Sequence, residues 1–281
     1  MKRLYVHCGR GAWGMLGVLC LGVGLGAVLS CAAGGGAVSS AAAERVAGTL
    51  LVSLDAREAS AGGATWVNKG SMGDFARIGE PKRETVGGQP AVTFNGTSDA
   101  YRSLHATPAD LTGAHARSIE VWAFNPTIDS AEEALVSWGR RGTDFNNMSF
   151  NYGTGSTYSA VTHYGPENDM AWAQEPAAGR WHHLVYTYDG TTSKIYADGV
   201  EQGSAAFALE TAADQHINIA AENSADSGEP QFASEFGDPA WQMSISGSIA
   251  LVRVHGGALT PDQIKANFAI DAARFGAVAA Q

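Results

Sequence analysis

Short apolar stretches alternate with turn residues along most of the chain from Thr49 onward. They are rich in Val, Ile, Tyr, Trp and Phe, and they end at Gly, Asn, Asp or Pro. This pattern is typical of β-strands of about four to eight residues separated by tight turns. The predicted strands lie in TLLVSLDA, PAVTFNG, SIEVWAFNP, EALVSWG, MSFNYG, HLVYTYDG, SKIYADG, HINIAAEN and GSIALVRVHGG.

Helical spacing is found in one late segment, TPDQIKANFAIDAARF. Thr260 is suited to the N-cap and Pro261 to the first helical position. Ile264, Phe268 and Ala272 then form an apolar stripe at intervals of four residues. Many short strands with one terminal helix predict an all-β fold, a two-sheet antiparallel sandwich with one short C-terminal helix.

Two adjacent histidines, His182 and His183, open the strand WHHLVYTY. Side chains alternate across a strand, so His183 shares a face with Trp181, while His182 shares the other face with Leu184. We therefore expect the two imidazoles to point to opposite sides, where they cannot bind one metal together. Asp198-Gly199 predicts a tight hairpin turn further along.

The first 31 residues read as a bacterial-type secretory signal, because a basic start precedes an apolar run that lacks acidic residues. A retained membrane anchor is the alternative. Cys31 follows a sequence similar to a lipoprotein processing box and is the candidate lipidated residue, whereas the small residues at 39–43 offer an ordinary cleavage site. Residues 32–48 read as a flexible tether and residues 49–276 as one domain.

The charge and the cysteine content of the chain disfavour some partners and bear on its disulfides. The chain has 18 Lys and Arg and 28 Asp and Glu; the leader holds three of the basic residues and no acidic one, so the remainder has a formal charge of −13. Such a surface disfavours nucleic acid and anionic lipid, and it leaves a lipid anchor as the only expected link to a membrane. All three cysteines lie in the leader, so we expect an exported domain without disulfides.

The segment GRWHHLVYTYDGTTSKIYADGVEQG resembles the central hairpin of laminin-G-like jelly-roll domains of the concanavalin A-like lectin and glucanase superfamily. PAVTFNGTSDAYRS, RSIEVWAFNP and GSIALVRVHGGALTPDQIKANF resemble other strands of these domains, in the same order. The resemblance covers residues 50–270 and implies a jelly-roll sandwich. It implies function only weakly, because this fold carries lectins, adhesion modules, enzymes and spacers.

Catalytic patterns are absent from the sequence. Glycosidases on this fold place acidic residues at alternating positions of one strand, and Glu120 has no such partner at Trp122 or Phe124. Glu132 and Glu133 are adjacent, so in a strand their side chains diverge. No serine nucleophile elbow or His-Glu-x-x-His zinc motif occurs. A carboxylate pair assembled from loops, such as Glu167 or Asp169 with Glu235 or Asp238, stays open.

Two longer polar stretches, 139–180 and 221–243, are the expected binding loops. An exposed aromatic platform there would bind sugar faces, whereas buried rings would only hold the loops down. The aromatic residues in or beside these loops are Trp138, Tyr152, Tyr158, Tyr164, Trp172 and Trp241; all but Tyr158 are our candidate ligand-binding residues.

Calcium is the one cofactor that the composition of the loops suggests, because they are rich in oxygen ligands. Asp144 and Asn146 are the first candidates and Asp99 is the second, with ordinary Asx turns as the alternative. The sequence thus predicts a non-catalytic binding or adhesion module, exported to the periplasm or cell surface, with a glycan or cell-surface polymer as its partner. A divergent polysaccharide hydrolase or lyase and a structural envelope component are the alternatives.

Overall fold

The computed structural model describes residues 43–59, 63–165, 167–225, 228–233 and 242–277. The predicted leader with Cys31, most of the predicted tether, and Trp241, Glu235 and Asp238 lie outside the described residues. Within the described ranges, no helix combines the length and the apolar character needed to cross a membrane.

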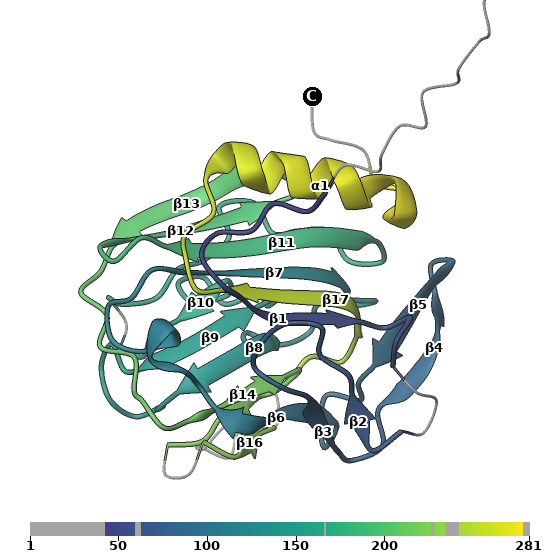
Figure 1. Ribbon diagram of the computed structural model, residues 1–281, viewed down its shortest axis with the longest axis horizontal. Helices are drawn as coiled ribbons and strands as arrows, with labels where there is room; N and C mark the ends of the chain where they lie inside the picture. The colour runs from purple at the N-terminus through teal and green to yellow at the C-terminus, as the bar shows by residue number, and fades with distance from the viewer. Residues whose placement is uncertain (1–42, 60–62, 166, 226–227, 234–241, 278–281) are drawn as a thin grey trace, which may run out of the picture. The chain divides into compact units, whose positions relative to one another are not determined.

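The described strands form two large antiparallel sheets, and the predicted all-β jelly-roll sandwich is confirmed (Figure 1). Sheet A has the order β13-β12-β11-β7-β17-β5-β4, with β1 also paired to β17, and sheet B has the order β10-β9-β8-β14-β6-β3-β2. The strands of sheet A are β1 (Leu50–Asp55), β4 (Lys82–Val86), β5 (Gln89–Thr93), β7 (Arg117–Phe124), β11 (Trp181–Tyr188), β12 (Thr192–Ala197), β13 (Val200–Ala206) and β17 (Ser248–His255). Those of sheet B are β2 (Thr65–Trp66), β3 (Phe75–Ile78), β6 (Ala100–Ala106), β8 (Ala134–Gly139), β9 (Asn147–Asn151), β10 (Val161–Thr162) and β14 (His216–Ile219). A small ladder pairs β15 (Glu222–Asn223) with β16 (Pro230–Gln231), and a 3₁₀ turn, η1, spans Ala109–Leu111.

The main core lies between the two sheets and is filled by alternate side chains of the central strands. Val121 of β7 and Tyr186 of β11 face Phe150 of β9 and Ile219 of β14, and all four are fully buried. Because alternate residues face opposite ways, the other half of each strand points away from this core. The outer faces of both sheets therefore carry side chains that need cover or partners of their own.

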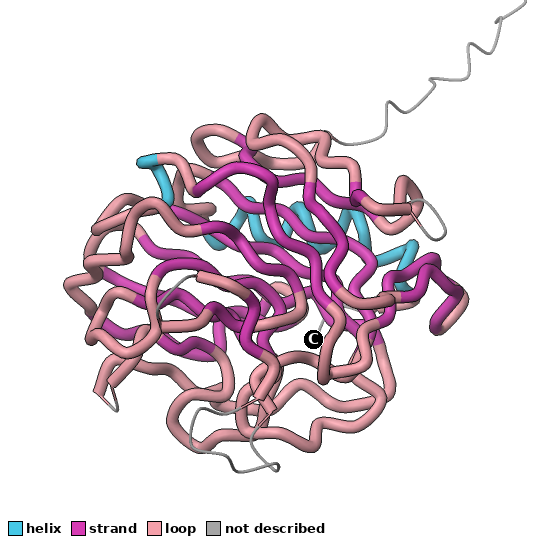
Figure 2. The backbone as a smooth tube through the Cα atoms, turned by 90° about the horizontal axis from the view of Figure 1, so that it is seen from below, coloured by secondary structure: helices cyan, strands magenta, loops and turns pink. Residues whose placement is uncertain are grey.

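Helix α1 (Pro261–Phe275) covers part of the outer face of sheet A (Figures 1 and 2). The predicted start is confirmed, because Thr260 caps the helix and Pro261 begins it. A second apolar cluster fills the space between helix and sheet: Trp122 stacks on Phe275 at a centroid distance of 4.1 Å, and Trp181 packs beside them. Trp122 and Trp181 are thus buried, as strand residues were expected to be.

Residues 43–48, at the end of the predicted tether, contact the domain. Asn267 of α1 accepts a hydrogen bond from the Arg45 N–H and donates one to the Arg45 carbonyl, at 2.7 and 2.9 Å. Glu44 lies 2.9 Å from the Nε of Arg253 in β17. The last residues of the predicted tether are therefore held against α1 and sheet A, a difference that their small, featureless sequence did not indicate.

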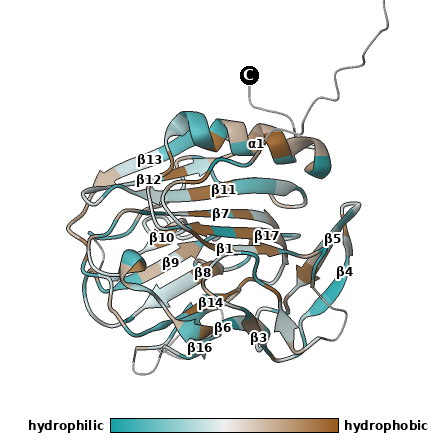
Figure 3. Cartoon of the chain, viewed as in Figure 1, coloured by the Kyte–Doolittle hydropathy of each residue, from teal (hydrophilic) through white to brown (hydrophobic). Residues whose placement is uncertain are grey.

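Strand β4 has a different character from the strands around it, because it is hydrophilic along most of its length (Figure 3). It pairs with β5 alone, at the edge of sheet A. Charged residues such as Lys82 and Arg83 on an edge strand discourage pairing with another chain.

Candidate functional site

The adjacent histidines point to opposite faces of β11, as predicted. His183 stacks on Trp122 at 5.2 Å on the α1 side, and its Nε2 lies 3.1 Å from Glu120 Oε2. The ring of His182 lies 6.0 Å from that of Tyr152, and its Nδ1 is 2.8 Å from Asp198 Oδ2. His182 is only 1% exposed, with Asp198, the Ala177 carbonyl and Tyr152 against its ring.

Glu120 is the centre of a buried polar cluster beneath α1. Its carboxylate lies within hydrogen-bond distance of the Nε2 atoms of His183 and His255, and it accepts bonds from Asn267 Nδ2. Burial alone would raise the pKa of Glu120, but the hydrogen bonds from His183 and His255 outweigh burial and hold that pKa well below its usual range. Glu120 is thus an ionised carboxylate with its acceptor sites filled.

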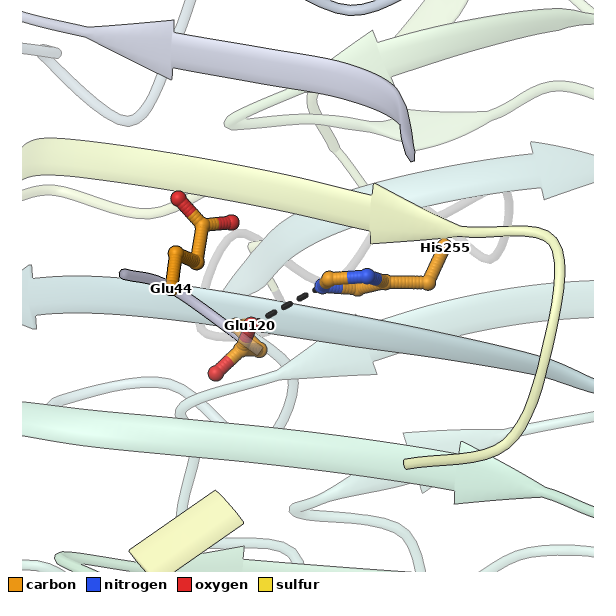
Figure 4. A group of neighbouring side chains, drawn as sticks. All are labelled: Glu44, Glu120 and His255. Carbon is orange, nitrogen blue, oxygen red and sulfur yellow. Dashed lines mark hydrogen bonds and ion pairs between the residues drawn. The ribbon is translucent and has the colours of Figure 1, made fainter. Parts of the chain in front are cut away.

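Glu44, Glu120 and His255 are close enough to be considered as metal ligands (Figure 4). One ligand atom from each lies within 4.8 Å of the others. Their partners argue for a different role, because the Arg253 guanidinium lies against Glu44, and Glu120 is taken up by the two histidines and Asn267. We interpret these residues as a clamp that joins β7, β11, β17, α1 and the N-terminal segment.

The expectation of an exposed aromatic platform is wrong for three of the five candidates. Trp138 and Tyr152 are fully buried, and Trp172 is 7% exposed. Trp138 Nε1 donates to the Leu111 carbonyl and Tyr152 Oη to the Ala177 carbonyl, so these rings anchor loops from below. Tyr164 is half-buried, with the Arg141 guanidinium 5.6 Å from its ring centre.

The predicted calcium candidates lie in two separate loops, Asp99 in one and Asp144 with Asn146 in the other. Asp99 is 4% exposed, and its two carboxylate oxygens accept the backbone N–H groups of Glu80 and Asn95 at 2.7 and 3.3 Å, so they tie neighbouring loops together. Asp144 is exposed in the β8–β9 loop, and Asn146 Nδ2 donates to the Asp144 carbonyl.

Asp144 lines a cavity of about 410 Å³ that we call the rim pocket, with Phe145, Gly165, Glu167 and Asn168. Two loops contribute to it: residues 140–146 between β8 and β9, and the described residues 163–165 and 167–169 after β10. They meet because β9 pairs with β10, which puts the start of one strand beside the end of the other. His163 Nδ1, 3.2 Å from the Asn147 carbonyl, ties the two loops at their base.

Both loops adopt backbone conformations that bulky residues rarely occupy. Phe145 has φ = 61° and Tyr164 has φ = 70°. Gly165 follows at φ = 105°, and a Cβ there would approach Asn168 Nδ2 to 2.6 Å, so only glycine fits. Bonds from the Glu210 N–H to the Phe145 carbonyl and from Asn168 Nδ2 to the Tyr164 carbonyl hold these conformations. Non-glycine residues in such conformations cluster at functional sites.

Behind the rim pocket, on the outer side of sheet B, lies a group that we call the carboxyl cluster: Glu132, Asp169 and Glu222 around Arg141. Arg141 Nη1 is 3.3 Å from Glu132 and 2.8 Å from both oxygens of Glu222. Burial, and then the charge of Glu222, raise the pKa of Glu132 well above its usual range. Burial likewise raises the pKa of Asp169 to about 7.

The geometry of this cluster does not suit glycosidic cleavage. Glu132 and Glu222 share a hydrogen bond and one arginine nitrogen, whereas a hydrolytic pair stands roughly 5 to 9.5 Å apart across the substrate. Glu133 does diverge from Glu132, as predicted, and accepts from Asn125 Nδ2 at 2.8 Å. The sequence did not predict Phe145, Asn168 and Glu222 as site residues. The one signal for them was their position in the two long polar stretches.

A family model described as the concanavalin A-like lectin/glucanases superfamily, laminin G type, matches residues 95–265, more than half of the chain. The chain belongs to this superfamily. Comparison with curated protein sequences finds no match. For a concanavalin A-like domain the two sheets, the central β11–β12 hairpin and the closing strand with its helix are all in place, as the resemblance implied.

Solved structures with the same fold include carbohydrate-related proteins. Domain 4 of the extracellular arabinanase AbnA from Geobacillus stearothermophilus, in complex with arabinotriose, has a TM-score of 0.56 and 16% identity, covering 79% of this chain and 98% of that one. Trypanosoma rangeli sialidase with the inhibitor DANA gives 0.51 and 14%, covering 78% of this chain and 32% of the sialidase. The receptor-binding domain of botulinum neurotoxin C/D mosaic gives 0.51 and 11%, covering 79% and 51%.

Proposed function

We propose that this concanavalin A-like domain is an exported, non-catalytic glycan-binding module whose ligand occupies the rim pocket. The pocket has the two components that a sugar site needs, an apolar surface and convergent polar groups. Phe145 supplies a half-buried ring. Asp144, Glu167 and Asn168 supply oxygen atoms from two loops around it. This combination of ring and acceptors in one cavity carries the proposal.

The geometry of the buried carboxyl cluster supports binding without turnover. Hydrolysis requires two carboxyl groups that face each other across a gap large enough for the scissile bond. Glu132 and Glu222 instead contact each other and Arg141. Hydrolase or lyase activity would need Asp144 and Glu167, which line the cavity from different loops, to act as the pair, and this alternative is an outcome of the experiment below.

Export and a lipid anchor at Cys31 belong to the same proposal. The N-terminal segment lies beside α1 on the outer side of sheet A, through the contacts of Glu44 and Arg45. The rim pocket is built on loops of sheet B. A chain held by its N-terminus would therefore leave the pocket free.

Calcium is proposed as an alternative occupant of the β8–β9 loop, with Asp144 and Asn146 as its first oxygen donors, where a bound ion would compete with the glycan for Asp144. Preferential binding to the folded state would raise the melting temperature in millimolar calcium, and chelator would reverse the rise. Asp144→Asn should reduce the calcium effect and Asp99→Asn should not. If calcium does not change the melting temperature, the role of Asp99 and Asp144 is to hold their loops through hydrogen bonds.

The experiment that tests the function is a binding and turnover assay on one polysaccharide panel, containing arabinans, galactans, β-glucans, chitin and acidic polymers. We expect retention of at least one polysaccharide without new reducing ends or unsaturated products. Glu167→Ala and Phe145→Ala should weaken that retention, while Glu84→Gln on edge strand β4 serves as the control. Product formation that Asp144→Asn abolishes would replace the binding module with an enzyme.

A further inference from the structure

Negative charge at the rim pocket comes from the two carboxylates that line it. Asp144 and Glu167 line the cavity itself, and both are exposed. The carboxyl cluster behind the pocket adds little charge, because the pKa of Glu132 is raised well above its usual range and Arg141 balances Glu222. The charge that a ligand meets in the cavity is therefore that of Asp144 and Glu167.

Positive charge near the pocket is small by comparison. Arg141 is 5% exposed and is occupied by Glu222 and Glu132, with its guanidinium over the ring of Tyr164. Arg140 is the other arginine of the β8–β9 loop, and it is exposed. An acidic ligand would thus meet more carboxylates than guanidinium groups.

A hydrogen-bond acceptor without a described donor also indicates a ligand that carries hydroxyl groups. Asn168 is 7% exposed and lines the cavity; its Nδ2 is used by the Tyr164 carbonyl, and no described residue donates to its Oδ1. Buried acceptors of this kind are satisfied by a donor such as a hydroxyl group.

We propose that the rim pocket takes uncharged, hydroxyl-rich glycans and discriminates against acidic ones that carry carboxylate or sulfate. This inference rests on the proposed glycan-binding function and adds its ligand class. Sugar hydroxyls donate to the carboxylate and amide oxygens of the pocket, whereas an anionic substituent would be repelled by them. Repulsion between like charges weakens the binding of acidic glycans, whereas it has little effect on the affinity for uncharged ones.

The test uses matched sugars that differ only in charge: lactose against sialyllactose, and carboxyl-reduced polygalacturonate against polygalacturonate, beside the panel above. For any pair that binds, we expect the neutral member to bind at least about tenfold more tightly at low salt. The ratio should shrink at about 0.5 M salt, where exposed charges are screened.

Glu167→Gln and Asp144→Asn should reduce the ratio of the affinity for the neutral sugar to that for the acidic sugar. Each variant removes a charge but keeps a carbonyl acceptor. Glu84→Gln removes the same charge from β4 in sheet A and should leave the ratio unchanged. Equal or tighter binding of acidic sugars, or a ratio that the two pocket variants do not alter, would overturn the ligand class while the binding function stands. Retention of no glycan at all would overturn both.

Discussion

At the scale of single residues, two buried glutamates show how partners decide ionisation. Glu120 and Glu132 are 0% and 2% exposed, so burial disfavours the charged form of both. Glu120 faces the Nε2 atoms of two histidines and the amide of Asn267, and hydrogen bonds keep it ionised. Glu132 lies beside Glu222, with Arg141 shared between them. Burial and then the charge of Glu222 raise the pKa of Glu132. The first glutamate stabilises the fold, and the second places a proton beside the candidate site.

Glu120→Gln tests the clamp. The amide keeps the size of the side chain but replaces one acceptor oxygen with a donor, which would face the N–H groups of Asn267 or a histidine. Leaving buried polar partners unpaired should lower the free energy of unfolding by about 3 kcal/mol or more. Urea unfolding followed by tryptophan fluorescence measures the change. Glu84→Gln, on the exposed β4, is the matched control, and coincident unfolding curves for the two variants would refute the clamp.

Asp169 provides a pH prediction. Burial raises its folded pKa to about 7, from a usual value of 3.8. Between these values the folded state holds a proton that the unfolded state has lost, so this group lowers stability as pH rises towards 7 and has no further effect above it. Asp169→Asn removes the titration. From pH 5 to pH 8 the stability of the natural protein should therefore fall relative to the variant, by up to about 2 to 3 kcal/mol. Urea midpoints at several pH values measure this difference, and parallel pH profiles would contradict it.

At the scale of elements, hydrophobic patterning decides what the sequence reveals. Every apolar stretch that was predicted as a strand contains one, and α1 has its predicted cap, first residue and stripe. Strand β4, KRETV, was missed because an edge strand with exposed side chains needs no apolar face. Strand β13, VEQGSAA, has no apolar stretch either, and only the hairpin turn predicted at Asp198-Gly199 indicated a strand there.

The candidate site was less predictable than the sheets, for two physical reasons. Strand parity already places Trp138 on the face of Val136, and Tyr152 on the face of Met148 and Phe150, so their burial was readable from the sequence. The rim pocket was not readable, because it depends on the pairing of β9 with β10. That pairing brings Asp144 beside Asn168, and no local pattern encodes it.

The N-terminal segment allows a test at the same scale. A chain that begins at Ala43 keeps the Glu44–Arg253 ion pair and both Arg45 backbone bonds to Asn267. A chain that begins at Thr49, the boundary expected from sequence, loses all three. We expect the shorter chain to be less stable by about 2 kcal/mol or more, because the amide of Asn267 loses two partners beneath α1. Differential scanning calorimetry measures the melting temperatures of the two chains. Equal melting temperatures would show that residues 43–48 do not stabilise the domain.

At the scale of the whole molecule, the proposed anchored end and the proposed binding pocket lie on different sides of the sandwich. Helix α1 and the N-terminal segment cover the outer side of sheet A (Figure 1). The rim pocket and the carboxyl cluster belong to the loops and outer side of sheet B. The main core between the sheets keeps these two sides apart and joins them in one rigid sandwich. Stability and ligand selection can therefore be changed independently, since Glu120 and Glu167 share no contact.

Immobilisation tests this separation. A single cysteine can be placed without competition, because the natural ones all lie before residue 32. Protein coupled to a surface through a residue added before Ala43 should bind the panel glycan as it does in solution. Protein coupled through Glu167→Cys should lose most of its binding capacity, because the surface then blocks the rim pocket. Coupling through Glu84→Cys on β4 controls for the attachment chemistry. Surface plasmon resonance gives the active fraction for each orientation. Loss of binding in the N-terminal orientation, with full binding through residue 167, would place the ligand on the α1 side and refute the rim pocket as its site.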